Sequence, residues 1–218
     1  TPVIVKDNIL LKANTDYTVT YENNETHAVS KKAPVKMGSY TMHVKGKGSC
    51  EGEFSVPCTV TDKDGTTSIT KVKVSIPAMV YRGDMPKPLL RLKDDILQEG
   101  TDYTVTYANT NAKGTATAVF IGQGAYTGVL KKTFKVKAAS IASIPYEDIT
   151  VSESAVYKKG GAKPDITVTM DGVKLTMGVD YTVSYKNNKK VGRKATVTIT
   201  GKGNYSGKVR REFQVVAE

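Results

Sequence analysis

The chain has 218 residues, enough for one large domain or for two to three small ones with cores of their own. Hydrophobic residues make up 39% of it and charged residues 24%, a balance typical of folded proteins that argues against a disordered chain. No apolar run approaches the roughly 18–20 residues of a membrane helix, so the sequence predicts no direct membrane insertion.

The positive charge is concentrated near the C-terminus. Of the net charge of +11, residues 151–218 contribute +7, with 13 basic and 6 acidic residues. Two interpretations stay open, a solvated basic face and a surface that contacts an anionic polymer. A nucleic-acid partner is not expected, because the sequence shows neither basic residues interleaved with exposed aromatics nor a helix suited to the major groove.

The chain begins TPVIVKDN, without an initiator Met or a signal-peptide core, so we expect a processed or excised fragment. A repeat follows along the whole sequence. Each copy contains a DYTVTY-type segment, then a glycine-rich turn, then an alternating strand. The three DYTVTY-type segments are residues 16–21, 102–107 and 180–185.

The register of the repeat defines three modules. Residues 38–88 align without a gap to 114–164, which lie 76 residues later. Copy one differs in two ways. It carries a ten-residue insertion, 25–34, and it lacks a counterpart of 72–83, which we expect to precede Thr1.

We expect boundaries that follow this repeat. The predicted modules are 1–61, 71–137 and 147–218, joined by linkers 62–70 and 138–146.

Each copy is predicted to consist of strands. In YTVTY, alternate residues share a face, so Tyr103, Val105 and Tyr107 are expected in the core. In copy three, Ala195, Val197 and Ile199 are expected inward for the same reason. No stretch keeps apolar residues at helical spacing, and glycine and asparagine recur at hairpin distances. The sequence therefore predicts an all-β fold of tandem small antiparallel sandwiches.

The unit combines Y-x-G, K-P, DYTVTY, an Asn-rich turn, G-x-G-x-Y-x-G and a closing F-x-V, best seen in residues 180–215. This pattern resembles the bacterial immunoglobulin-like repeats of Gram-positive surface and secreted proteins. The resemblance implies immunoglobulin-like modules, an extracellular location at the bacterial cell surface, and a role as spacer, stalk or adhesion repeat. The implied partners are other domains of the same polypeptide, with a cell-wall polymer or a host glycan or protein as further ones.

No constellation of an enzyme is visible. His27 and His43 are expected to be surface residues, and the acidic pairs 94–95 and 147–148 fall in turns or linkers, where acids are common. The chain is therefore predicted to be non-catalytic and to hold no cofactor. The DKDG segment at 62–65 is interpreted as a turn, with calcium as the weaker alternative because it offers too few ligands.

The basic residues of copy three are the candidate contacts for a polyanion, which is the second functional hypothesis. They flank the turn after 180–185 and lie on the last strand: Lys186, Lys189, Lys190, Arg193, Lys194, Lys208, Arg210 and Arg211. A third hypothesis treats the repeats as accessory modules of a secreted enzyme.

Two cysteines occur only in copy one. By register, Cys50 replaces Tyr126 and Tyr205, and Cys58 replaces an inward phenylalanine. An extracellular setting permits a disulfide. Eight residues of extended strand would instead separate the cysteines by about 26 Å, too far for a bridge. Both a disulfide and two reduced thiols stay open.

Overall fold

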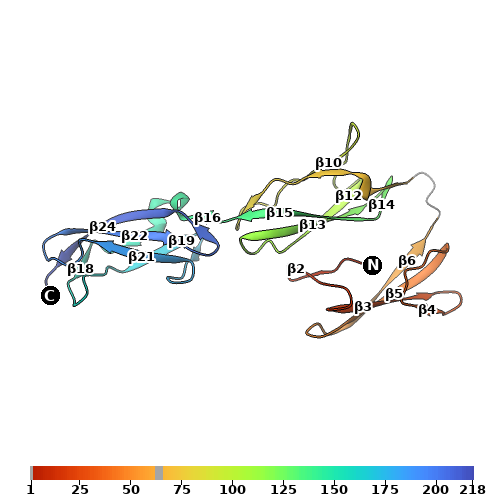
Figure 1. Cartoon of the computed structure of the whole chain (residues 1–218), viewed down its shortest axis with the longest axis horizontal. Helices are drawn as coiled ribbons and strands as arrows, with labels where there is room; N and C mark the ends of the chain where they lie inside the picture. The colour runs from red at the N-terminus through yellow and green to blue at the C-terminus, as the bar shows by residue number, and fades with distance from the viewer. Residues whose placement is uncertain (1, 62–65) are drawn as a thin grey trace. The chain divides into compact units, whose positions relative to one another are not determined.

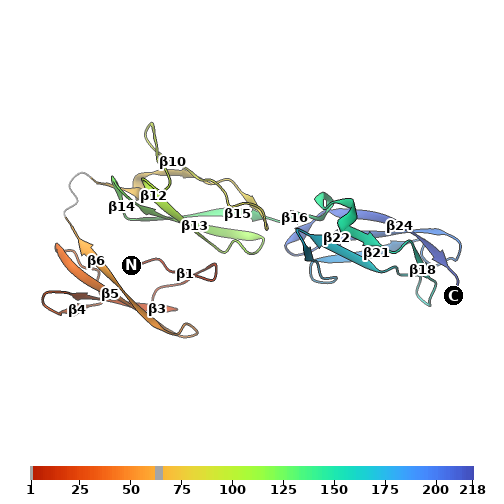
Figure 2. The same cartoon turned by 180° about the vertical axis from the view of Figure 1, so that it is seen from behind.

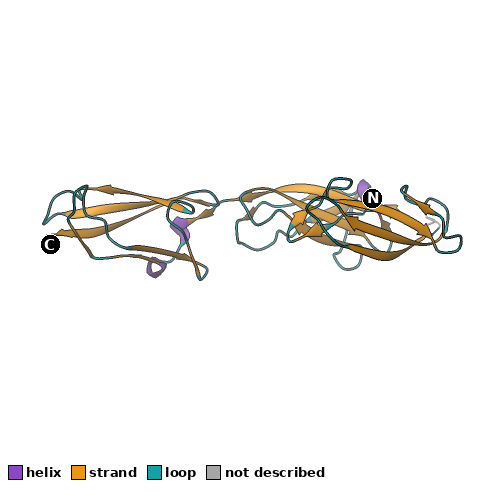
Figure 3. Cartoon of the chain, turned by 90° about the horizontal axis from the view of Figure 1, so that it is seen from below, coloured by secondary structure: helices purple, strands orange, loops and turns teal. Residues whose placement is uncertain are grey.

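The computed structural model describes residues 2–61 and 66–218, and almost all of its regular structure is β-strand (Figure 3). The DKDG segment, for which calcium was considered, lies outside the described residues. The only helices in the described ranges are three single-turn 3-10 helices, η1 (Ile69–Lys71), η2 (Ile141–Ser143) and η3 (Tyr146–Asp148). None of them is long or apolar enough to cross a membrane. The all-β prediction is confirmed.

Copy one forms a four-stranded sheet in the order β4-β3-β5-β6 and a separate hairpin β1-β2 (Figure 1). Its strands are β1 (Val5–Lys6), β2 (Ile9–Leu10), β3 (Tyr17–Asn23), β4 (Val29–Ser30), β5 (Gly38–Gly46) and β6 (Glu53–Val60). The ten-residue insertion supplies β4, which pairs with β3. Copy one therefore has one more strand at this edge than the other copies.

Copy two contains a four-stranded sheet β12-β13-β15-β9 and a three-stranded sheet β11-β10-β8. Its strands are β7 (Thr67–Ser68), β8 (Lys73–Ser75), β9 (Met79–Val80), β10 (Leu89–Leu92), β11 (Asp95–Ile96), β12 (Tyr103–Ala108), β13 (Gly114–Gly122), β14 (Tyr126–Thr127) and β15 (Val129–Lys137).

Copy three repeats this arrangement with the sheets β18-β24-β22-β21 and β17-β19-β20 (Figure 2). Its strands are β16 (Ala139–Ser140), β17 (Ile149–Val151), β18 (Ser154–Val156), β19 (Ile166–Met170), β20 (Val173–Lys174), β21 (Tyr181–Lys186), β22 (Lys194–Gly201), β23 (Tyr205–Ser206) and β24 (Lys208–Val216). Buried residues of both sheets form one core cluster. Copy three is thus a sandwich-like pair of sheets.

The predicted inward faces are confirmed in part, because Tyr103 is buried whereas Val105 and Tyr107 are only half-buried. Ala195, Val197 and Ile199 are fully buried, as alternation along a strand requires. The tyrosines that open the DYTVTY-type strands are also buried, and Tyr103 packs edge to face on Phe120 with centroids 5.7 Å apart. Burial is the main cause that raises the pKa of Tyr107 to about 12.

The structure corrects the predicted linkers, 62–70 and 138–146, in the parts that it describes. Ala139, Ile141 and Ile144 belong to the core of copy three, and Ile69 is fully buried. These residues carry apolar side chains in the pattern Ser-Ile-x-x-Val/Ile, so they are held in a core rather than left as a solvated connection.

The gapless register of 76 residues is also wrong around Ile69. β7 pairs with β14 as β16 pairs with β23, so Ile69 corresponds to Ile141, only 72 residues later. Copy three regains three residues through η3, which has no counterpart among the described residues of copy two, and a fourth between β17 and β18.

The chain divides into two compact units instead of three separate modules. Unit 1 comprises residues 1–77, 86–110 and 115–134, and unit 2 comprises residues 78–85, 111–114 and 135–218. The end of β15 and the Tyr81 turn therefore belong with copy three.

Candidate anion-binding surface

The basic turn of copy three, residues 186–194, is held in place by one buried amide. Asn188 is only 7% exposed, and its side-chain Nδ2 donates to the carbonyl of Ala162 at 2.9 Å. The N–H of Ala162 donates in return to the carbonyl of Asn188 at 2.8 Å. Asn187 adopts the left-handed conformation that asparagine tolerates. The turn therefore has a defined shape despite its exposure.

The basic side chains of this turn are brought together. Lys189, Lys190, Arg193 and Lys194 line a surface hollow of about 460 Å³ with Asn187. Within the described part of the chain, their one ion pair joins Lys194 Nζ to Glu212 Oε2 at 3.8 Å. Both of these side chains are well exposed, so the pair is weak. The turn keeps most of its positive charge available.

The basic residues of β24 have a mixed environment. Lys208 and Arg210 are exposed and lie opposite Thr200 and Thr198. A groove of about 930 Å³ beside them is lined by Lys186, Arg210 and Arg211, but also by three carboxylates, Glu147, Glu153 and Glu212. The acidic residues offset the basic ones, so this groove is less suited to a polyanion than the turn.

Arg211 differs from the other candidates. Its guanidinium carbon lies 4.1 Å from the ring centroid of Tyr146, and Nη2 donates to the Tyr146 carbonyl at 3.5 Å. Nη1 donates to the carbonyl of Arg210 at 3.1 Å, and the buried Nε has no hydrogen-bond partner among the described residues. Arg211 is therefore occupied in packing over η3, and the sequence did not indicate this role.

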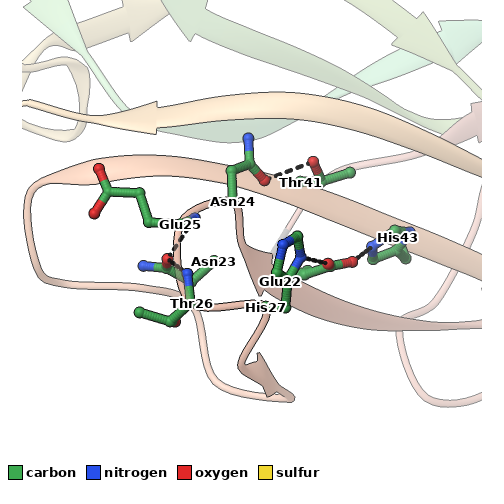
Figure 4. A network of polar contacts seen from close by, with 8 residues as sticks. All are labelled: Glu22, Asn23, Asn24, Glu25, Thr26, His27, Thr41 and His43. Atoms are coloured by element: carbon green, nitrogen blue, oxygen red, sulfur yellow. Dashed lines mark hydrogen bonds and ion pairs between the residues drawn. The ribbon is translucent and has the colours of Figure 1, made fainter.

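A second polar constellation, not predicted from the sequence, lies on the outer face of the copy-one sheet (Figure 4). One carboxylate oxygen of Glu22 contacts His27 Nδ1 at 2.9 Å and the other contacts His43 Nε2 at 3.2 Å. His43 Nδ1 lies 2.8 Å from Ser55 Oγ. Hydrogen bonds from His27 and then His43 are the main causes that lower the pKa of Glu22.

Ser55, His43 and Glu22 thus share the residue types of a hydrolytic triad, and they project from the outer face of an antiparallel sheet. Ser55 projects from an antiparallel strand, whose N–H groups lie in the plane of the sheet, at right angles to its side chains. No N–H of these strands is therefore aimed at the position where an oxyanion would form. In residues 2–61 and 66–218, no group of three or more acidic, histidine or cysteine side chains could hold a metal ion.

The disulfide alternative is not realised, because Cys50 and Cys58 are both free thiols. The N–H of Cys50 donates to the carbonyl of Lys47 within the glycine-rich turn, while Cys58 lies well along β6, opposite Tyr40. The continuous strand that begins at Glu53 keeps the two residues apart.

Comparisons with known proteins identify no relative: a scan against protein-family models, a search of curated proteins and a search of solved structures each found no match.

Proposed function

We propose that this chain is a non-catalytic run of immunoglobulin-like β modules that serves as a spacer, stalk or adhesion segment of a bacterial surface protein. The proposal is supported by the repeat, by its resemblance to bacterial immunoglobulin-like repeats, and by the way in which neighbouring copies are connected within unit 2.

The connection after β15 carries the proposal. Only Ala138 separates β15 from β16, and Ala139–Ser140 pairs at once with Tyr205–Ser206 of copy three. The N–H of Lys113 donates to Asn204 Oδ1 at 2.8 Å. Backbone pairing and buried side chains restrict rotation about such a connection far more than a flexible linker would. A spacer requires this property, because a pulling force must pass from one core into the next.

Single-molecule stretching of the full chain between two handles tests the proposal. A spacer built of packed cores is expected to unfold in discrete steps, each releasing chain at about 3.3–3.6 Å per residue. Gradual extension without steps would contradict it. A serine-directed activity probe tests the non-catalytic part, since labelling lost in Ser55→Ala would contradict that statement.

The basic turn supports a second function, the binding of an anionic glycan or wall polymer. Lys189, Lys190 and Arg193 are exposed and have no ion pair within the described ranges. Clustered exposed cations attract polyanions in a salt-dependent manner.

Retention on a heparin column measures this second function. A triple variant of Lys189, Lys190 and Arg193 to Ala should elute at lower salt. The matched control is Lys158, Lys159 and Lys163 to Ala, three lysines of the same copy that line a separate hollow. Equal loss of retention in both variants would mean that net charge alone is responsible.

A further inference from the structure

Copies two and three each contain an opening segment that covers one end of the core. We define the opening segments as residues 66–83 and 138–157. β7 pairs in parallel with Tyr126–Thr127, and β16 pairs in parallel with Tyr205–Ser206. The 3-10 turns that follow bury Ile69 and Ile141 completely, and η2 contacts both β23 and β24.

The same segments also complete the edge of the large sheet. β9 pairs in parallel with Val136–Lys137 at the end of β15, and β18 pairs with Gln214–Val216 at the end of β24. The residues next to this edge are buried in both copies, with Phe134 and Val136 at 5% and 3% exposure. One segment therefore covers two adjoining sites in each copy.

In copy one these two sites are not covered by the described residues. The counterparts of Tyr205 and Val215 are Cys50 and Val60, and both are only half-buried. β6 ends the sheet order, and within residues 2–61 and 66–218 no strand pairs with its outer edge. Pro57, which lacks an N–H, is typical of such an edge strand.

Because no described segment covers this edge, part of the inner face of the copy-one sheet is exposed. Val44 on β5 is 2% exposed, whereas its cross-strand neighbour Phe54 on β6 is 50% exposed. A largely apolar groove of about 490 Å³ is lined by Tyr17, Val44, Cys50 and Phe54. By register, this groove lies where Ile69 and Ile141 are seated in the other copies.

The composition of β6 agrees with an apolar occupant. Copies two and three carry Lys132 and Arg211 on the face that turns inward, while copy one carries Val56 at that position. Val56 is 38% exposed. Exposed apolar side chains gathered on one face, beside an unpaired strand edge, indicate an interaction surface.

We infer that the groove and outer edge of β6 in copy one bind an extended opening-type segment, Ser-Ile-x-x-Val/Ile followed by a short strand, from a polypeptide outside these 218 residues. The segment inserts its isoleucine beside Cys50 and Phe54 and pairs in parallel with Thr59–Thr61. A second copy of this chain is not the occupant, because both of its described opening segments are already seated in its own cores.

A synthetic peptide of residues 66–83, added to the full chain, tests the inference. This peptide carries three basic and no acidic residues, and the groove is also lined by Asp16, Glu51 and Glu53, so binding is measured at high salt, where attraction between exposed charges is screened. We expect saturable binding of one peptide per chain, slower hydrogen exchange over residues 54–60, and slower alkylation of both Cys50 and Cys58. Exchange in copies two and three should stay unchanged and reports that they are folded.

Two substitutions make the test specific. Ile69→Asp in the peptide and Phe54→Asp in the chain should each abolish binding, whereas Ser55→Asp, on the opposite face of β6 and outside the paired residues, should retain it. If Phe54→Asp unfolds copy one, the peptide with Ile69→Asp alone tests whether binding requires the isoleucine. No protection by the unaltered peptide at any concentration overturns the inference. Self-association of the chain that protects residues 54–60 also overturns it, because the occupant would then be a second copy.

Discussion

The rings of Tyr81 and Tyr205 meet edge to face in unit 2, with centroids 5.6 Å apart and planes at 86°. Tyr81 lies near the end of the opening segment of copy two, and Tyr205 lies in the glycine-rich turn of copy three. The ring of Tyr81 also packs against the copy-three core, to which Tyr205 belongs. The Tyr205 hydroxyl accepts a hydrogen bond from the neighbouring Arg82, which is the main cause that raises the pKa of the guanidinium.

Tyr81→Ala is expected to destabilise unit 2 by about 1–2 kcal/mol, because an edge-to-face aromatic pair contributes stability beyond that of the apolar area it buries. Urea unfolding of the full chain measures this effect. The matched control is Tyr157→Ala, the counterpart of Tyr81 by register, which is 41% exposed. Equal effects of the two substitutions would show that the ring pair contributes nothing specific.

Glu22→Gln is expected to change the acid stability of copy one. The folded-state pKa of Glu22 is lowered, so its contribution to stability is present above the ordinary carboxyl pKa and is lost as pH falls through the lowered value. The unaltered chain should therefore lose stability in this window, and Glu22→Gln should lose less. Thermal unfolding between pH 7 and pH 3 is the measurement, with Glu25→Gln, an exposed neighbour, as the control.

Asn188→Ala is expected to destabilise copy three by about 1–3 kcal/mol, because the substitution leaves the buried carbonyl of Ala162 without its side-chain donor. The exposed Lys189→Ala should leave the free energy of unfolding unchanged. If the basic turn acts through its defined shape, Asn188→Ala should also weaken heparin retention although it removes no charge. Retention that is unaffected would assign anion binding to charge density alone.

Gly201→Ala is expected to destabilise copy three by at least about 2 kcal/mol through overpacking. A Cβ at this position would lie 2.6 Å from the backbone nitrogen of Ser206 and 2.7 Å from its carbonyl oxygen. Lys202→Ala in the same turn serves as the control, read by urea unfolding. Near-equal stability of the two variants would mean that the turn moves aside readily.

The glycine-rich turns show how far the sequence could be interpreted. Glycine commonly supplies a positive φ in hairpin turns, and Gly203 does so at +65°. Gly201, in contrast, is required because the backbone of Ser206 passes too close for any side chain. A local pattern indicates that glycine is needed, but a contact between chain segments decides why.

The candidate sites likewise contain some features that the sequence predicts and others that depend on tertiary contacts. Exposure of Lys189, Lys190 and Arg193 was predicted from charge alone, whereas the occupation of Arg211 by Tyr146 depends on two segments that lie 65 residues apart. The contact of Glu22 with both His27 and His43 depends on cross-strand pairing between β3 and β5 and on the turn after β3. No spacing along the chain indicates either contact.

By itself, the sequence determined the three-fold repeat, the all-β class and the inward residues of each strand, because alternation along an extended backbone assigns side chains to faces before any tertiary contact forms. Only the tertiary structure decided that residues 138–146 belong to a core, that Ile69 corresponds to Ile141, and that the β6 face of copy one is left exposed. These features depend on which distant strands pair, and pairing between strands is set by the packing of whole sheets rather than by the order of neighbouring residues.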